Sequence, residues 1–337
     1  MSLELPFLDD MHVHLRQGEF SRSLVHAIRA GGSDRVLVMP NTAPPITSAA
    51  RLSAYVAELK AADPTVDYLI TLFLCPELST QTLRDAQKLG AIGVKCYPKG
   101  VTTGSQCGVE SFDGYAHLFQ EMEELGMSLH LHGEVPGECI LTAEETFLAQ
   151  LFELHAKFPR LKIVLEHVTS AMGVQAVKAC GPNVAATITA HHLDLTIDDV
   201  VGHSLNFCKP VAKLPDDRAA LRQVVLEGDS KFFLGSDSAP HPVGKKICHG
   251  CAAAGVFSQP YLALYLADTF DRLGCLDKLE AFACRYGAQF FGLKTNSERV
   301  LKLFKKEFIV PTEFKCSSGD IVIPFRAGET LGFSFTS

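Results

Sequence analysis

Eight apolar segments of strand length alternate with helical segments along this 337-residue chain. One strand and one helix recur about every thirty residues, the size of a strand–helix unit. Strands that are separated by helices pair in parallel, and eight of them predict a closed (β/α)8 TIM barrel in the α/β class. The expected strands are residues 7–15, 35–39, 67–74, 91–97, 128–132, 162–167, 184–189 and 231–236, and the expected helices are residues 21–30, 48–62, 80–89, 114–125, 144–158, 171–179, 216–226, 259–273 and 277–290.

The alternation runs through most of the chain without a break in composition. No Pro/Gly/Ser-rich linker and no run of charges divides it, so we expect a single domain over residues 1–337. Residues 294–337 are less regular and are expected to form a C-terminal extension packed on the barrel, with possible short strands at 320–324 and 330–335 across a Gly-Glu turn. A doubly wound open sheet is the alternative fold, but no G-x-G-x-x-G turn follows the first strand.

Composition excludes several classes of partner. The formal net charge of -7 and the lack of a long basic cluster argue against a nucleic-acid surface. No segment reaches the ~18 to 20 apolar residues of a membrane span, and no signal peptide is evident at the amino terminus. The eleven cysteines are scattered through apolar and helical segments, which favours free thiols in a reducing compartment and predicts a cytoplasmic protein.

Polar side chains collect where the expected strands end. His12 and His14 lie two residues apart on the first strand, so both project from one face. Alone, this pair fits either two metal ligands or two tolerated histidines. In a parallel barrel, however, the active site lies at the carboxyl ends of the strands, and further candidate ligands stand there: His130, His132, Glu166, His167 and Asp237. Histidine and carboxylate suit zinc, and the number of candidates exceeds one tetrahedral site, which indicates two metal ions.

Two of these positions leave alternatives open. His130 and His132 share a face of the fifth strand, so spacing alone does not choose between them. Lys95 lies within an apolar strand, where a buried charge is costly unless it is paired or removed. It either extends to solvent at the strand end, or carries CO2 as a carbamate that bridges two cations.

Seven sequence blocks resemble those of the dihydroorotase family, of the compact monofunctional type of bacteria and fungi within the amidohydrolase superfamily. They occur in order over nearly the whole chain and are specific only in combination. The blocks are Leu8–Arg16 (LDDMHVHLR), Met39–Pro45 (MPNTAPP), Val94–Pro98 (VKCYP), His132–Glu134 (HGE), Leu165–Thr169 (LEHVT), Gly235–His241 (GSDSAPH) and Pro324–Thr330 (PFRAGET).

This resemblance implies a binuclear zinc centre. His12, His14 and Asp237 would hold the more buried zinc, His132 rather than His130 would hold the other together with His167, and carboxylated Lys95 would bridge the two. A hydroxide shared by the zinc ions would be the nucleophile, and Asp237 would act as general acid and base. The implied reaction is the reversible interconversion of N-carbamoyl-L-aspartate and (S)-dihydroorotate in pyrimidine (UMP) biosynthesis.

The resemblance also implies a pocket for the substrate carboxylate. Arg16 and Asn41 offer a guanidinium fork and an amide donor, and His241 would complete the pocket. Backbone groups near Lys209 and in the 251–254 loop would add contacts. That loop departs from the family pattern by one residue, which leaves Ala252 and Ala254 as alternatives. Thr102 and Thr103 match a mobile loop that closes over substrate, whereas His191 and His192 are interpreted as loop residues without a ligand role.

Two other functions compete with this interpretation. A hydantoinase or dihydropyrimidinase would share the metal ligands but would not need Arg16 and Asn41 for a carboxylate. A non-catalytic scaffold relative is disfavoured because all six metal-site positions hold residues able to bind metal. Relatives are commonly homodimers, so the expected partners are a small-molecule substrate and a second copy of the chain, with neither nucleic acid nor membrane.

Overall fold

A parallel eight-stranded sheet forms the centre of the computed structural model, which describes residues 2–250, 252–296 and 299–337. The strands follow one another in sequence order, and each pairs in parallel with the next. They are β2 (Leu8–Val13), β3 (Ser33–Val38), β4 (Asp67–Phe73), β5 (Ala91–Cys96), β6 (Ser128–His132), β7 (Lys162–Glu166), β8 (Val184–Ile188) and β9 (Phe232–Leu234).

The sheet closes on itself where the chain leaves β9. Val13 forms a parallel bridge with Ser238, and the Asp237 amide donates to the His12 carbonyl at 2.9 Å. Asp10 strengthens this seam, because it accepts hydrogen bonds from the Ser236 amide at 2.7 Å and the Ser236 hydroxyl at 2.6 Å. The expected (β/α)8 barrel is therefore confirmed.

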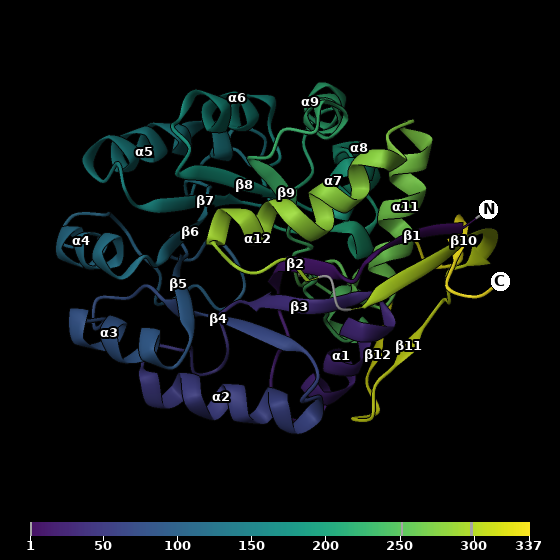
Figure 1. The fold of residues 1–337 in the computed structure, drawn as a ribbon, viewed down its shortest axis with the longest axis horizontal. Coiled ribbons are helices and arrows are strands. Elements are labelled where there is room, and N and C mark those ends of the chain that lie inside the picture. The colour runs from purple at the N-terminus through teal and green to yellow at the C-terminus, as the bar shows by residue number, and fades with distance from the viewer. Residues whose placement is uncertain (1, 251, 297–298) are drawn as a thin grey trace.

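Helices surround the sheet on its outer face (Figure 1). Several begin at serine caps, as at Ser48, Ser79 and Ser170, whose side chains each accept a backbone N–H of the first turn. The helices are α1 (Gly18–Ala30), α2 (Ala49–Ala62), α3 (Thr80–Lys88), α4 (Ala116–Leu125), α5 (Ala143–Lys157), α6 (Ala171–Ala179), α7 (Ala190–Asp194), α8 (Ile197–Val200), α9 (Pro215–Glu227), α10 (Val243–Lys246), α11 (Leu262–Arg272) and α12 (Tyr286–Phe291).

Shorter helical turns complete the connections: η1 (Ser204–Asn206), η2 (Gln259–Tyr261) and η3 (Leu276–Lys278), with a π-helical turn η4 (Ala281–Arg285) before α12. Within the described residues, no helix combines the length and the apolar character needed to cross a membrane.

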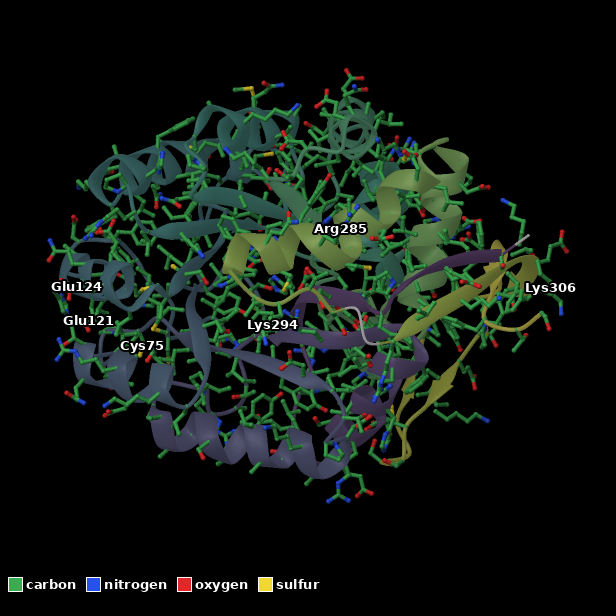
Figure 2. The ribbon with its side chains drawn as sticks, in the orientation of Figure 1. Cys75, Glu121, Glu124, Arg285, Lys294 and Lys306 are labelled. Atoms are coloured by element: carbon green, nitrogen blue, oxygen red, sulfur yellow. The ribbon has the colours of Figure 1, made fainter. Side chains whose placement is uncertain are left out.

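Apolar side chains fill the barrel interior below the carboxyl ends of the strands. Met11, Leu37, Val164 and Phe233 belong to one buried cluster inside the barrel, and Phe290 and Phe291 of α12 pack against it. Gly287 approaches Met11 so closely that an added Cβ would lie 2.8 Å from the Met11 Cγ. The amino-terminal end of the barrel is thus packed, while polar side chains gather at its carboxyl end. Figure 2 shows the side chains that occupy the space between sheet and helices.

The carboxy-terminal segment differs from the expectation in one respect. A ten-residue strand, β10 (Val300–Ile309), pairs antiparallel with β1 (Ser2–Pro6) and with β13 (Thr330–Ser334), and both termini lie beside this sheet (Figure 1). The local pattern did not predict β1 or β10, because their partners lie about 300 residues apart in sequence. The expected strands near 320 and 330 exist, but β12 (Ile321–Val322) pairs with β11 (Phe314–Lys315) and not with β13.

Candidate active site

A pocket opens at the carboxyl ends of the barrel strands and brings together residues from most of the chain. Of the expected site residues, Lys95 lies below the pocket, and His241 and Ala252 are not part of its lining. The lining residues are His12, His14, Arg16, Asn41, Tyr97, Thr102, Thr103, His132, His167, Lys209, Asp237, Ala239, Ala254 and Gly255.

Three candidate ligands converge on one point of this pocket. The Asp237 Oδ1 lies 3.0 Å from the His14 Nε2 and 3.4 Å from the His12 Nε2, and all three side chains are buried. The closing of the barrel produces this convergence, because Asp237 follows β9 and is hydrogen-bonded to the backbone of β2.

The protonation state of His14 indicates that the His12 Nε2, the His14 Nε2 and the Asp237 Oδ1 would be stabilised by a cation. His14 Nδ1 donates to the Asn41 Oδ1 at 2.8 Å, and the orientation of the Asn41 amide is fixed because its Nδ2 donates to the Thr103 carbonyl at 3.0 Å. Burial lowers the pKa of His14 to about 4, so its imidazole is neutral near pH 7 and its only proton is on Nδ1. The His14 Nε2 therefore presents a lone pair to the Asp237 carboxylate, and a shared cation would relieve this contact.

Asp237 is ionised in this environment. Burial alone would raise the pKa of Asp237, but its contacts with the imidazoles of His14 and His12 hold it below its usual value. The set of two imidazoles and one carboxylate matches the ligands that Zn²⁺ prefers, so these residues fit a metal ion.

A second pair of histidines lies beside the first group. The ring centroids of His132 and His167 are 4.8 Å apart, and those of His12 and His167 are 5.1 Å apart. His132 Nε2 donates to the Glu134 Oε2 at 2.8 Å, which leaves the Nδ1 lone pair as the available ligand atom. His167 Nδ1 is buried without a hydrogen-bond partner among the described residues.

His130 does not line the pocket, and both of its ring nitrogens have hydrogen-bond partners. Its Nδ1 bonds to the Glu166 Oε1 at 2.6 Å and its Nε2 lies 2.8 Å from the Ser128 hydroxyl, while its ring stacks on Phe291. Because both ring nitrogens have partners, His130 has no free ligand atom. Of the two strand-β6 histidines that spacing could not separate, His132 is the one in the pocket.

Glu166 links His12, which lines the pocket, to His130, which does not. Its carboxylate accepts hydrogen bonds from the His12 Nδ1 at 2.7 Å, the His130 Nδ1 at 2.6 Å and the Thr187 hydroxyl at 2.6 Å. Burial opposes its ionisation, but the charge and the hydrogen bond of His12 hold the pKa of Glu166 well below its usual value. A carboxylate that binds Nδ1–H of His12 fixes the tautomer that presents Nε2 to a metal.

We expect Glu166→Gln to weaken zinc binding by about 10- to 100-fold, because the amide is a weaker acceptor for the His12 N–H. Competition with a chromophoric chelator would measure the zinc affinity. Glu121→Gln is the matched control: Glu121 is also buried, but it pairs with Arg84 on the barrel exterior. Unchanged zinc affinity in folded Glu166→Gln would contradict the role of Glu166 in holding His12.

Lys95 is fully buried on β5, not extended to solvent. Its Nζ has no hydrogen-bond partner among the described residues and lies 5.1 Å from the centroid of the Tyr97 ring. Burial lowers the pKa of the Lys95 ammonium to about 8. A buried amine with this pKa has an appreciable neutral fraction near pH 7, and the neutral amine is the form that reacts with CO2.

Arg16, which lines the pocket, is held in a strained backbone conformation with φ 57°. Its Nε donates to the Pro240 carbonyl at 3.0 Å, and its Nη2 lies 3.1 Å from the His241 Nε2. The same His241 Nε2 lies 3.0 Å from the Ala254 carbonyl oxygen. Arg16, His241 and Ala254 therefore form one connected group, and Ala254, unlike Ala252, lines the pocket.

The loop that carries Thr102 and Thr103 lies over the pocket. Asn41 Nδ2 donates to the Thr103 carbonyl, and Lys209 Nζ donates to the Val101 carbonyl at 2.7 Å. This loop is thus held by the Asn41 side chain, which was expected at the substrate, and by the side chain of Lys209, where only backbone contacts were expected. Since each of these hydrogen bonds uses a group that a substrate carboxylate could also bind, substrate and loop backbone compete for the same donors.

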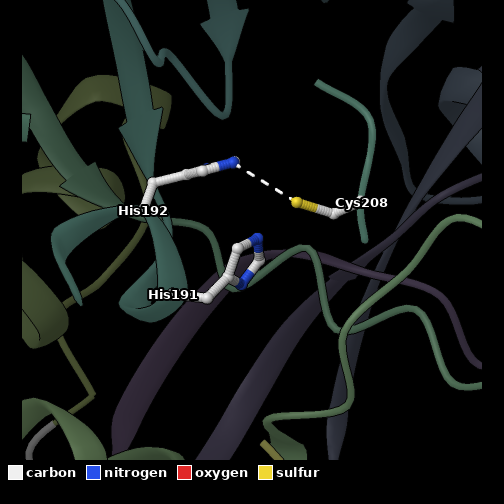
Figure 3. A group of neighbouring side chains, drawn as sticks. All are labelled: His191, His192 and Cys208. Atoms are coloured by element: carbon white, nitrogen blue, oxygen red, sulfur yellow. Dashed lines mark hydrogen bonds between the residues drawn. The ribbon is translucent and has the colours of Figure 1, made fainter. Parts of the chain in front are cut away.

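The interpretation of His191 and His192 as loop residues is wrong. Both are buried in the short helix α7, which begins at Thr189 with its side chain accepting from the His192 amide. Figure 3 shows them beside Cys208, whose Sγ lies 3.6 Å from the His192 Nε2. The Pro210 carbonyl accepts hydrogen bonds from both the His192 Nε2, at 3.1 Å, and the Cys208 thiol, at 3.2 Å. These two groups therefore already have a protein partner.

We expect His192 to make stability depend on pH. Burial lowers its pKa to about 4, below the unfolded value near 6.5, so the unfolded state binds more protons between these values. The His192 contribution is complete above pH 6.5 and is lost as the pH falls towards 4, at roughly 1.4 kcal/mol per pH unit. Denaturant unfolding between pH 4.5 and 7 should show a shallower dependence for His192→Gln. The exposed His203, changed to Gln, should keep the parent slope, and equal slopes in both variants would contradict this account.

Sequence reasoning missed Lys213, the role of Glu134 and the backbone conformation of His167 and Asp237, all of which shape this site. Lys213 is buried and supports Glu134, with its Nζ 3.5 Å from the Glu134 Oε1. His167 and Asp237 adopt positive φ angles of 42° and 44°, which turn both side chains at the ends of their strands. The HGE block contained a signal for Glu134, but no local signal pointed to Lys213, because its role depends on a contact across 79 residues.

A parallel barrel with titratable side chains at the carboxyl ends of its strands defines a barrel enzyme with its chemistry at that end. The amidohydrolase family model matches residues 5–302. The chain is 46% identical over 335 residues to a probable dihydroorotase of Schizosaccharomyces pombe, which covers 98% of each chain. It is 40% identical to the dihydroorotase of Saccharomyces cerevisiae, over 98% of this chain and 97% of that one.

A crystal structure supports the same assignment. Dihydroorotase from Saccharomyces cerevisiae in complex with 5-fluoroorotic acid superposes with a TM-score of 0.95 at 39% identity, over 99% of this chain and 98% of that one. The chain therefore belongs to the amidohydrolase family and, within it, to the dihydroorotases. It is an enzyme, a cyclic amidohydrolase.

Proposed function

We propose that the chain interconverts N-carbamoyl-L-aspartate and (S)-dihydroorotate in pyrimidine biosynthesis. The observation that carries this proposal is the combination of two groups in one pocket. A neutral His14 lone pair faces the Asp237 carboxylate at 3.0 Å, which calls for a cation, and the buried face around Arg16 offers a guanidinium for a carboxylate. A cyclic amide that carries a carboxylate fits both.

Six residues would hold two zinc ions. His12, His14 and Asp237 would hold one, His132 and His167 the other, and the carbamate of Lys95 would bridge them. When bound, the metal ions would polarise the amide carbonyl and lower the pKa of the attacking water. His12, His167 and Lys95 each have a buried nitrogen without a hydrogen-bond partner in residues 2–250, 252–296 and 299–337. These nitrogens support this assignment, because such atoms are costly unless a ligand satisfies them.

The side chains of the chain supply the remaining chemistry. Asp237 enters as a carboxylate, takes the proton of the attacking water and delivers it to the ring nitrogen as the amide bond breaks. Arg16 and Asn41 bind the substrate carboxylate, with His241 and the backbone near Lys209 and Ala254 or Ala252 completing the pocket. The loop with Thr102 and Thr103 closes over the substrate and excludes water.

A comparison of three ring substrates tests the proposal. The zinc- and bicarbonate-supplemented protein should hydrolyse dihydroorotate at least about a hundredfold more efficiently than hydantoin or dihydrouracil, which lack the carboxylate for Arg16. A preference for the uncharged rings would overturn the carboxylate assignment and favour a hydantoinase. Elemental analysis separates the enzyme from a scaffold: far less than two zinc ions per chain, with no turnover after reconstitution, would favour the scaffold.

We also propose that residues 1–337 form a single domain and that the chain assembles as a homodimer. The pairing of β10 with both β1 and β13 supports the first point, since it ties the 294–337 extension to the amino terminus. Light scattering coupled to size-exclusion chromatography tests the second, and a monomeric mass at working concentration would contradict it.

A further inference from the structure

Lys246 is a buried lysine outside the set of side chains described so far. It lies in the short helix α10 and is 5% exposed. Its Nζ donates to three backbone carbonyls: Phe207 at 2.8 Å, Gly255 at 2.8 Å and Ala253 at 3.1 Å. An ammonium has three N–H donors, so this arrangement satisfies all of them.

The charge of Lys246 has no acidic partner. In the described part of the chain, no carboxylate lies within ion-pair distance of its Nζ, which sets it apart from Lys213, another buried lysine, which lies beside Glu134. A buried charge without a counter-ion is costly, and structural lysines are usually paired. A bound anion nearby would offset that cost.

The three carbonyls belong to two segments that flank the pocket. Phe207 stands two residues before Lys209, whose side chain lines the pocket and holds the loop over it. Ala253 and Gly255 enclose Ala254, the carbonyl oxygen of which lies 3.0 Å from the His241 Nε2. The Phe207 carbonyl also accepts from the Gly255 amide at 2.9 Å, so the two segments meet directly above the Lys246 ammonium.

The segment around Ala254 has little freedom to move toward the barrel. Gly255 has φ 147°, and an added Cβ would lie 2.2 Å from the Ala239 carbonyl oxygen. The Ala239 amide donates to the Val256 carbonyl at 2.8 Å. One side of this segment is therefore fixed by the barrel, and its other side is fixed by Lys246.

The positive charges of Lys246 and Arg16 both act on His241. Burial lowers the pKa of His241 to about 3, and the charges of Arg16 and Lys246 act in the same direction. Lys246 thus stands behind the backbone wall that Arg16 and His241 face.

We propose that Lys246 is a positioning residue for recognition of the substrate carboxylate. Its ammonium joins the Phe207 and Ala253–Gly255 segments into one wall and adds a positive charge behind it, while it touches neither the substrate nor the reacting atoms. This inference rests on the proposed function, because it assumes that the anion bound by Arg16 and His241 is the substrate's carboxylate.

Lys246→Met removes the ammonium and keeps the length of the side chain. We expect the KM for dihydroorotate to rise about tenfold, the effect of losing ~1.4 kcal/mol of binding, while kcat changes little. Lys245→Met is the matched control, because Lys245 is the exposed residue next to Lys246. Lys245 bonds to Ala253 through its backbone carbonyl, which the substitution keeps. Its KM should equal that of the parent.

Direct binding separates this role from a structural one. We expect the Kd of orotate, which carries a carboxylate, to rise as KM does in calorimetry, and the Kd of uracil, the same ring without a carboxylate, to stay constant. If Lys246→Met fails to fold, Lys246→Gln carries the same test, because it keeps two donors and loses the charge.

Three outcomes would overturn the inference: an unchanged Kd for orotate, an equal loss of affinity for orotate and uracil, or a fall in kcat at constant KM. The parent enzyme, assayed in parallel, keeps the two proposals apart. Failure of the parent to turn over dihydroorotate counts against the proposed function, whereas orotate binding still decides the role of Lys246.

Discussion

Replacing Lys95 by Ala should abolish zinc binding at the proposed bridged site and lower kcat on the order of a thousandfold, since bound metal ions would supply several kcal/mol of transition-state stabilisation. The Lys95 Nζ is fully buried and has no partner among the described residues, so its surroundings fit a group that extends the amine with two oxygens. Zinc content by elemental analysis and turnover of dihydroorotate would measure the effect.

Short carboxylic acids should restore part of the activity of Lys95→Ala, because acetate or propionate can enter the vacated space and replace the carbamate oxygens. Lys88→Ala, at an exposed position on α3, should keep full zinc content and activity and should not respond to these acids. Lys95→Met, which fills the cavity, guards against loss of folding. Full activity in either Lys95 variant would remove this residue from the site.

Replacing Asp237 by Asn should lower kcat by about 10²- to 10⁴-fold, the usual contribution of a general acid–base group. The amide keeps the shape of the side chain but cannot take a proton from the attacking water. Its closest neighbours, the His14 Nε2 at 3.0 Å and the His12 Nε2 at 3.4 Å, would also lose the carboxylate charge that favours a cation.

Zinc content distinguishes the two roles of Asp237. With zinc added in excess, we expect Asp237→Asn to bind metal and remain nearly inactive. In its pH–rate profile, the fall in kcat at low pH that protonation of Asp237 causes in the parent should be absent. Asp277→Asn, at an exposed position, should match the parent. If excess zinc restored kcat of Asp237→Asn to the parent value, Asp237 would serve as a ligand without moving protons.

The proposed carboxylate pocket and the proposed metal site are built from different parts of the barrel. The proposed metal ligands come from β5 and from the ends of β2, β6, β7 and β9, whereas the groups proposed to face the carboxylate lie in the connections after β2, β3, β8 and β9. The rigid strands hold the reacting centre, and the loops provide selectivity, as is usual for barrel enzymes. Lys246 joins two of those loops.

Much of the fold could be predicted because its determinants are local. The alternation of apolar strands with helices can be recognised from residues that are close together in sequence. This alternation placed His12, His132 and Asp237 at strand ends. The strand β10 was not predicted, since its charged, half-exposed residues show no clear apolar strand pattern. They pair with β1, at the other end of the chain, and with β13. Likewise, the burial of His191 and His192 in α7 depends on the packing around them.

The sequence by itself determined which chemical groups stand at the carboxyl end of the barrel, because strand periodicity and strand order decide where each side chain projects. Only the tertiary structure decided which atom of each group is available. His130 and His132 share a strand face, yet Glu166 and Ser128 occupy both nitrogens of His130, whereas Glu134 leaves Nδ1 of His132 free. The role of an imidazole depends on the partner of its second nitrogen. For His130 the decisive partner is Glu166 on the neighbouring strand β7. For His132 it is Glu134, which Lys213 supports across 79 residues of sequence.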